Sequence, residues 1–143
     1  MFDRIRISAQ GRNQLIQIKR KTGIETYNII CRYALVLSLS EKSLPPKETF
    51  SSSGGLEIEW RVFCGNENEL YENLLVQRCK EDDLDPNYEN LKDLLLVHLH
   101  RGLAYLNANP EQIFLVYTKH NHSLFRKLFS SFFNFFNGPS TRS

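Results

Sequence analysis

The sequence predicts a mostly α-helical chain with short strands, an α+β fold. Apolar residues recur at helical spacing in four stretches, and residues that cap helices stand at the starts of these stretches. Two shorter stretches alternate apolar and charged residues, which is typical of strands that are buried on one face. With 143 residues, the chain is long enough to bury one main core.

The first strand is predicted at the start of the chain, where Ile5 and Ile7 alternate with Arg4, Arg6 and Ser8. The two arginines therefore share a face that points away from the core. A single strand leaves its backbone groups unpaired, so we expect its partner to be the same strand of a second copy. A partner strand within the same chain is the alternative.

Two helices are predicted directly after this strand. Ser8 is a good N-cap for a helix over residues 9–22, and Gly23 is placed to end that helix in the left-handed conformation. Thr26 is the expected cap of the next helix, over residues 27–39, which is apolar around most of its circumference. A helix of this kind needs cover on nearly every side.

Strand, helix and helix in this order predict a ribbon-helix-helix-like N-terminal unit, followed by additional helices. In such a unit two copies pair their strands into a ribbon, which can enter the major groove of DNA. We therefore predict an obligate homo-oligomer, a tetramer built from two ribbon-paired dimers.

The middle of the chain contains a loop, a second strand and a third helix. Residues 41–55 are rich in Pro, Ser and Gly and predict the loop. Residues 56–63 alternate apolar and charged side chains and predict the strand, with Trp60 in the core. Asn66 is the expected N-cap of a helix that ends near Lys80.

A fourth and longer helix is predicted from Asp85 and Pro86 to about Asn107. His98 lies on its apolar face, and we interpret it as a hydrogen-bonded core histidine and not as a metal ligand. Gly102 inside this helix predicts a close contact with another helix.

The last part of the chain differs in composition from the rest. A short strand is predicted from Ile113 to Tyr117, and six of the ten phenylalanines fall within residues 124–136. We divide the chain into a main domain, residues 1–109, and a Phe-rich extension, residues 110–143. The extension is expected to be an amphipathic helix that makes an oligomer contact or a partly disordered tail.

The charge distribution is uneven and points to a polyanion as partner. Residues 1–32 carry seven basic and two acidic side chains, net +5, whereas residues 33–100 carry six and thirteen, net −7. A basic head on an acidic body favours binding to DNA through one face. The alternative is that these basic side chains are only solvated surface charges that bind no partner. The candidate DNA-binding residues are Arg4, Arg6, Arg12, Lys19, Arg20 and Lys21, together with Thr26 at the start of the second helix, where N–H groups can bind phosphate.

The sequence contains no motif that predicts catalysis, a metal or a cofactor. A glycine-rich phosphate loop is missing, and Cys31, Cys64 and Cys79 are too far apart to indicate a zinc site. The acidic run at residues 81–85 lacks the spacing of a calcium loop and predicts a solvated turn. No secretion signal or membrane-spanning stretch is recognisable, so we expect a cytoplasmic protein without a membrane partner.

Four segments together resemble DndE, the small subunit of bacterial DNA sulfur-modification (phosphorothioation) systems. They are RIRIS, KTGIETYNIICRYALVLSLS, IEWRVFCGNENELYENLL and HLHRGLAYL, and they cover roughly residues 4–106. The resemblance implies a ribbon-helix-helix-like fold, a compact tetramer and binding to duplex DNA with a preference for nicked duplex. It also implies work beside the other Dnd subunits, to which sulfur transfer is assigned, and DNA contacts at the matching positions Lys19, Arg20 and Lys21.

Two other functions fit the same resemblance. The chain could be the strand-nicking enzyme of the system, which would cut plasmid DNA in the presence of a divalent metal. It could also be a structural adaptor that holds the modification complex together through its acidic body without binding DNA.

Overall fold

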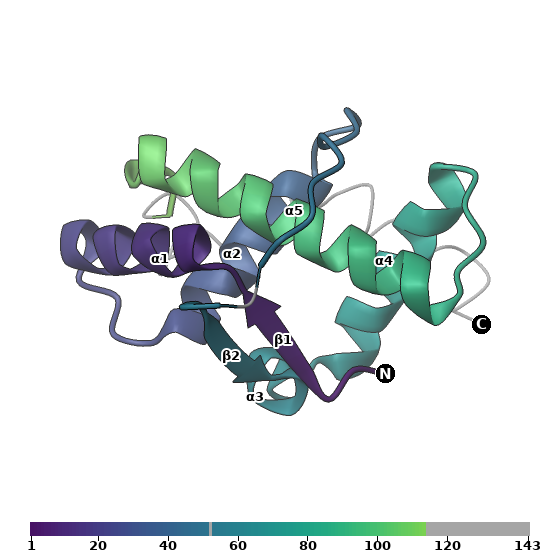
Figure 1. The fold of residues 1–143 in the computed structure, drawn as a ribbon, viewed down its shortest axis with the longest axis horizontal. Coiled ribbons are helices and arrows are strands. Elements are labelled where there is room, and N and C mark those ends of the chain that lie inside the picture. Colours follow the sequence, from purple (N-terminus) through teal and green to yellow (C-terminus); the bar gives the residue numbers. More distant parts are fainter. Residues whose placement is uncertain (52, 114–143) are drawn as a thin grey trace, which may run out of the picture.

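A computed structural model describes residues 1–51 and 53–113 of the chain. Its elements in chain order are β1 (Arg4–Ile7), α1 (Ala9–Thr22), α2 (Tyr27–Leu39), β2 (Leu56–Glu59), α3 (Trp60–Cys64), α4 (Asn68–Glu81) and α5 (Tyr88–Ala108). Figure 1 shows α5 along the length of the molecule, with α1 beside one half, α4 near the other end, and the two strands to one side. The predicted α+β class is confirmed.

The first two helices form where capping chemistry predicts them. The Ser8 hydroxyl accepts a hydrogen bond from the Gly11 N–H at 3.1 Å and so caps the N-terminus of α1. Gly23 has φ 75°, and its N–H donates to the Lys19 carbonyl, which closes the other end of α1. Thr26 precedes α2, but its side chain makes no capping hydrogen bond.

The core forms between α2 and α5, which cross at very short distance. Gly102 of α5 allows this contact, since a Cβ there would lie 1.8 Å from the Ala34 carbonyl oxygen of α2. Ala34, Leu35, Leu99 and Leu103 are fully buried beside this crossing. The cover that the apolar second helix needs is therefore supplied largely by α5 of the same chain.

The partner of the first strand is not a second copy, so this prediction was wrong. β1 pairs antiparallel with β2 of the same chain, with Ile5 opposite Ile58 and Arg6 opposite Glu57. Glu57 lies 3.0 Å from Arg4 and 3.3 Å from Arg6, so the acidic face of β2 matches the basic face of β1. A ribbon between two copies is not needed to pair β1 on this edge.

The second strand is shorter than predicted, because the chain turns into α3 after Glu59. Trp60 is buried as expected and packs edge-on against Phe2, with ring centroids 5.0 Å apart. Val62, which strict alternation would place inside, is 48% exposed, whereas Phe63 is buried. Trp60 and Phe63 lie three residues apart, which is helical spacing. Burial in this segment follows that spacing and not the alternation of apolar and charged residues in the sequence.

The later helices begin one or two residues after the predicted positions. α4 follows Glu67 and not Asn66. α5 follows Asn87, whose side-chain oxygen accepts from the Asn90 N–H at 2.9 Å, so the cap is an asparagine beyond the predicted Asp85-Pro86 start.

The predicted strand from Ile113 is wrong at its first residue, because Ile113 is helical and buried. The rest of that strand and the Phe-rich segment lie outside the described residues. Gly102 and His98 behave as predicted, the first at the helix crossing and the second in a core hydrogen bond to Ser38 at 2.8 Å.

Candidate nucleic-acid interface

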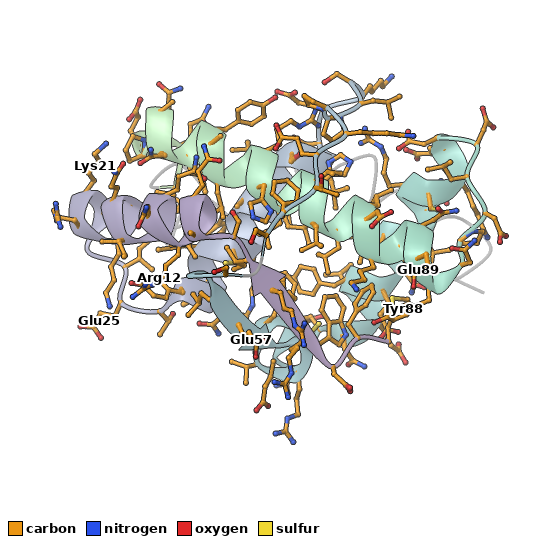
Figure 2. The ribbon with its side chains drawn as sticks, in the orientation of Figure 1. Arg12, Lys21, Glu25, Glu57, Tyr88 and Glu89 are labelled. Atoms are coloured by element: carbon orange, nitrogen blue, oxygen red, sulfur yellow. The ribbon has the colours of Figure 1, made fainter. Side chains whose placement is uncertain are left out.

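Four of the predicted DNA-binding residues lie on the solvent side of α1. Arg12, Lys19, Arg20 and Lys21 are all exposed, while Gly11, Leu15 and Ile18 form the buried face of the same helix. Arg12 and Lys19 are seven residues apart and so share one flank of the helix, and Lys21 lies on the opposite flank (Figure 2). Arg20 points outward between the flanks. These four residues are called the α1 basic surface.

The cations of the α1 basic surface are held only weakly by the rest of the chain. The Lys19 ammonium lies 5.2 Å from the centre of the Tyr27 ring, and the Lys21 ammonium is 3.5 Å from the Asn107 carbonyl oxygen. Within residues 1–51 and 53–113, none of the four takes part in an ion pair. Their charges are therefore available to an anionic partner.

Part of this pattern also stabilises the helix itself. Lys19, Arg20 and Lys21 stand in the last turn of α1, where positive side chains interact favourably with the negative end of the helix dipole. Arg12 stands near the other end, where a positive charge gains nothing from the dipole. A purely structural role explains three of the four positions but leaves Arg12 unexplained.

Arg4 and Arg6 form a second basic site, on the sheet. Both side chains are more than half exposed, but they share one carboxylate, Glu57, across the strand pair. Glu59 stands opposite Arg4 in the register but is paired with Arg61, so Arg4, Arg6 and Arg61 with the two glutamates leave a surplus of one positive charge. The sheet therefore offers less positive charge than the α1 basic surface.

The structure gives Thr26 a weaker role than predicted. Its side chain is exposed and makes no capping hydrogen bond to the start of α2. Glu25, the preceding residue, is also exposed and brings a negative charge to the same turn (Figure 2). This charge weakens the attraction of a phosphate to the N–H groups of α2.

Three other arginines of the chain are used inside the fold, and sequence reasoning missed this use. Arg32 donates to the carbonyl groups of Phe63 and Val62 at the end of α3. Arg78 places all five of its N–H donors, four on the carbonyl groups of Leu39, Glu41, Lys42 and Ser43 and one on the Asp82 carboxylate.

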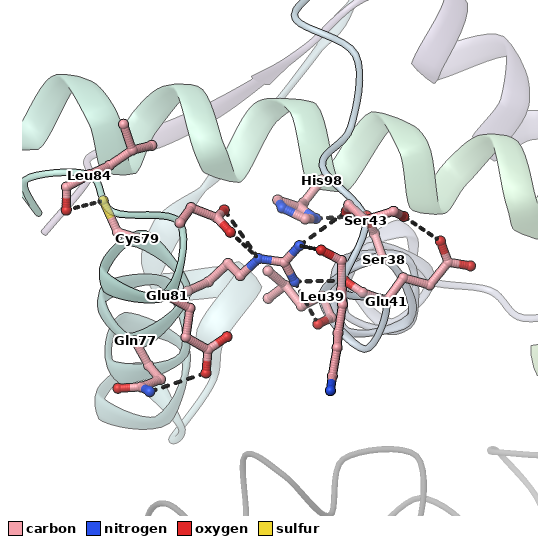
Figure 3. A network of polar contacts seen from close by, with 12 residues as sticks. Ser38, Leu39, Glu41, Ser43, Gln77, Cys79, Glu81, Leu84 and His98 are labelled. Atoms are coloured by element: carbon pink, nitrogen blue, oxygen red, sulfur yellow. Dashed lines mark hydrogen bonds and ion pairs between the residues drawn. The ribbon is translucent and has the colours of Figure 1, made fainter.

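Arg101 completes this arrangement from α5. Its guanidinium donates to the Ser38 hydroxyl at 2.7 Å, to the Ser38 carbonyl at 2.8 Å and to the Ser43 carbonyl at 3.0 Å. Figure 3 shows the polar contacts of Leu39, Glu41 and Ser43 at the end of α2 and in the turn after it. Arg78 and Arg101, with residues 38–43 between them, are called the arginine clamp.

The Ser38–His98 pair resembles a nucleophile and its base but is a core contact. The Ser38 hydroxyl accepts a hydrogen bond from Arg101 at 2.7 Å and forms a second one with Nδ1 of His98 at 2.8 Å. Both side chains are almost fully buried, and burial lowers the pKa of His98 to about 3. A substrate cannot reach this pair.

His100 is used in the same structural way. Its Nδ1 lies 2.8 Å from the Leu96 carbonyl and must donate to it, so Nε2 accepts from the Ser8 N–H and hydroxyl. The ring also stacks on Phe50 at 3.7 Å, and burial lowers the pKa of His100. The two histidines therefore hold α5 to α2 and to the start of α1.

The cysteines are unreactive thiols. Cys31, Cys64 and Cys79 are free and buried. Burial raises the pKa of Cys64 to about 12 and also raises the pKa of Cys31 and Cys79. The described part of the chain contains no group of three side chains placed to hold a metal ion. Among the same residues no helix has the length and apolar character needed to cross a membrane.

Comparison with known proteins assigns the family. The family described as DNA sulphur modification protein DndE matches residues 4–112 of the chain. This match spans β1 to the end of α5 and so includes every described element. The chain belongs to the DndE family.

A solved structure supports the assignment. The crystal structure of DndE from Escherichia coli B7A, described as involved in DNA phosphorothioation modification, is 25% identical, with a TM-score of 0.59. The similarity covers 74% of the present chain and 98% of the E. coli chain, so the extra length lies on the present protein. A search among curated proteins found no match.

Proposed function

We propose that this DndE-family protein is the DNA-binding subunit of a DNA phosphorothioation system and that the α1 basic surface contacts DNA phosphates. The observation that carries the proposal is the absence of ion-pair partners, among the described residues, for Arg12, Lys19, Arg20 and Lys21. The other arginines of the main domain are mostly engaged with carboxylates or carbonyl groups. Charges left available on one helix suit a partner that carries a row of phosphates.

The contacts of this surface position the DNA without reading its sequence. Lysine and arginine side chains on a convex helix reach phosphates, which are the same at every base pair. Arg4 and Arg6 would add to the binding only where DNA also reaches the sheet, and Glu57 reduces their contribution. We therefore expect weak sequence preference.

We further propose that nicked duplex is bound more tightly than intact duplex. A nick relieves the elastic cost of bending, which is of order 1–6 kcal/mol for a smooth bend of a short site. Contacts on both flanks of α1, from Arg12 on one side to Lys21 on the other, are reached together more easily by bent DNA. The other Dnd subunits are the partners that would use the bound DNA, and a homo-tetramer would multiply the basic surfaces.

A titration distinguishes this proposal from the alternatives. The full chain is titrated against intact, nicked and single-stranded DNA of one sequence, each at two salt concentrations. The expected order is nicked, then intact, with a slope of log affinity against log salt near −0.9 for each phosphate that the protein neutralises. Equal affinity for nicked and intact duplex would remove the preference for nicks, and affinity no better than that of an acidic control protein would favour the adaptor function.

The role we propose is binding and not catalysis. The histidines and cysteines of the described residues are buried in structural contacts, which supports this assignment. Incubation of the protein with supercoiled plasmid and Mg²⁺ or Mn²⁺ should leave the plasmid uncut. Relaxation that scales with protein concentration through purification would identify a nicking enzyme instead.

A further inference from the structure

Among the described residues, β1 is paired along one edge, with β2, and its other edge faces α5. The Trp60 N–H donates to the Asp3 carbonyl at 2.9 Å, so Asp3 and Trp60 are a hydrogen-bonded pair of the antiparallel ladder. Hydrogen-bonded pairs alternate with non-bonded pairs along such a ladder. Ile5 and Ile7 therefore turn their N–H and C=O groups toward β2, and Arg4 and Arg6 turn theirs away from it.

The hydrogen bond of Ser8 confirms that the open edge of β1 faces α5. The Ser8 N–H is on the same side as those of Arg4 and Arg6, and it donates to Nε2 of His100 on α5. One turn back along α5 lies Leu96, and another turn back lies Lys92. Among residues 1–51 and 53–113, no hydrogen bond engages the backbone N–H or C=O of Arg4 or Arg6.

The strand and the helix separate there and leave a groove between them. The groove has a volume of about 240 Å³, and residues 2–6 line one wall along its length. The other wall is α5, with Leu95 and Leu96 toward the core and Lys92 toward solvent. The Ser8–His100 contact closes one end, and Tyr88, which is 51% exposed, borders the other (Figure 2).

We propose that the open edge of β1 binds a short extended segment of another protein, which adds a third strand to the sheet. The edge presents N–H donors and C=O acceptors in alternation, and this is the pattern that an extended backbone completes. A phosphate backbone offers acceptors only and cannot match it. The proposal is independent of DNA binding through the α1 basic surface.

The charges of the groove define the sequence of this segment. Side chains of an added strand that lie beside Arg4 and Arg6 share their outer face, where the two guanidinium groups divide one glutamate. Lys92 adds a positive charge on the helix side and Asp3 a negative one at the start of the strand, so the residues that line the groove carry a net charge of +2. The side chain of the added strand that lies between these two positions faces Leu95 and Leu96. The segment therefore alternates acidic and apolar residues.

A second copy of the chain is a poorer occupant than an acidic segment. Antiparallel pairing of β1 with itself about Ile5 would set Arg4 of one copy opposite Arg6 of the other, and like charges directly opposite each other are destabilising.

The test uses a short acetylated and amidated peptide that alternates glutamate with valine, and a twin with lysine in place of glutamate. Amide hydrogen exchange of the full chain is measured by NMR. Without peptide, the amides of Arg4 and Arg6 should exchange faster than those of Ile5 and Ile7. The glutamate peptide should bind and slow the Arg4 and Arg6 amides, and the lysine peptide should bind at least about tenfold more weakly.

A matched pair of variants separates the backbone edge from the side chain. Arg6→Pro removes an N–H that the β1–β2 ladder does not use, which is the kind of position where an edge strand tolerates proline. Arg6→Thr removes the guanidinium but keeps the N–H. We expect Arg6→Pro to lower peptide affinity about tenfold or more, and Arg6→Thr to lower it only a few-fold.

Several outcomes would overturn the proposal. They are failure of the glutamate peptide to bind, equal binding of both peptides, and protection of the Arg4 and Arg6 amides by an oligonucleotide instead. Protection of these amides without peptide, increasing with protein concentration, would show that a second copy occupies the edge. Because the exchange measurement is made on the unaltered chain, it decides the question even where Arg6→Pro does not fold.

Discussion

Arg20 and Arg78 both stand in the last turn of helices of equal length, yet the fold uses them in opposite ways. Each lies in the last turn of a 14-residue helix. Arg20 is exposed on the α1 basic surface, whereas Arg78 is buried in the arginine clamp with every donor satisfied. The helix dipole favours both, so the difference comes mainly from the carbonyl groups of residues 39–43 that Arg78 reaches. One arginine stabilises the fold, and the other is available to a partner.

This comparison predicts its largest effect at Arg78. Arg78→Met removes the donors to four carbonyl groups and leaves Asp82 without its buried partner. Loss of one member of a buried ion pair costs about 3–5 kcal/mol. We expect a fall of this size in the unfolding free energy from denaturant titration. The matched control, Arg20→Met, should lower that free energy by no more than the dipole contribution of one exposed charge, about 0.3–1 kcal/mol, and a loss in it as large as that in Arg78→Met would remove the distinction.

The next effect concerns the helix crossing that the clamp secures. Gly102→Ala places a methyl group against the Ala34 carbonyl, which is backbone and cannot turn aside. Overpacking of this kind costs about 1–3 kcal/mol, and thermal unfolding would measure it. Gly23→Ala is the contrasting variant, because no atom lies within 4 Å of its Cβ position and only the left-handed φ opposes it. Equal tolerance of both changes would show that α2 and α5 pack loosely enough to admit a methyl group.

A third effect is the pH dependence of the unfolding free energy, to which the buried His98 contributes and the α1 basic surface does not. Burial lowers the pKa of His98 to about 3, below the ordinary value near 6.5, so the unfolded chain binds this proton first. Its contribution to stability is therefore complete above about pH 6.5 and is lost progressively as the pH falls toward 3.

The slope of unfolding free energy against pH should approach about 1.4 kcal/mol per unit for this one proton. We expect His98→Asn to reduce the slope between about pH 6 and pH 5, where carboxylates contribute little. Lys21→Ala should leave it as it is. An unchanged slope in His98→Asn would mean that the imidazole is not held neutral.

The local parts of the fold could be predicted from the sequence because their causes are local. Ser8 and Gly23 define α1 through hydrogen bonds to neighbours three or four residues away. The partner of β1 lies 49–55 residues away, and the prediction missed it. The acids of LEIE do complement the arginines of RIRI, but charge complementarity between distant segments does not by itself show which strands pair.

The candidate site could be predicted only in part, for a related reason. A sequence shows which residues are positive but not which of them find a carbonyl group in the fold. Arg32 counted toward the basic head, yet it caps α3. Arg4 and Arg6 are exposed as predicted but share Glu57. The cations of α1 were identifiable from helical spacing, and the structure adds that their charges are not neutralised within the described residues.

The smallest effect on stability should accompany the largest effect on function. Replacement of Lys19, Arg20 and Lys21 by alanine removes three exposed cations and no buried side chain. We expect the oligomeric state of this variant to match that of the unaltered chain, and its unfolding free energy to fall only by the small helix-dipole contribution of the three charges. Light scattering and denaturant titration check this before any binding is measured.

The most direct test of the central claim is the affinity of that triple variant for nicked duplex DNA across a series of salt concentrations. Its control replaces three exposed lysines elsewhere, Lys42, Lys80 and Lys92, by alanine and so removes the same charge. We predict that the variant of α1 binds weakly, with a salt slope flatter by about 0.9 for each phosphate that it no longer neutralises, while the control binds as the unaltered chain does. Equal weakening in both variants, or unchanged affinity in the variant of α1, would contradict the assignment of DNA binding to the α1 basic surface.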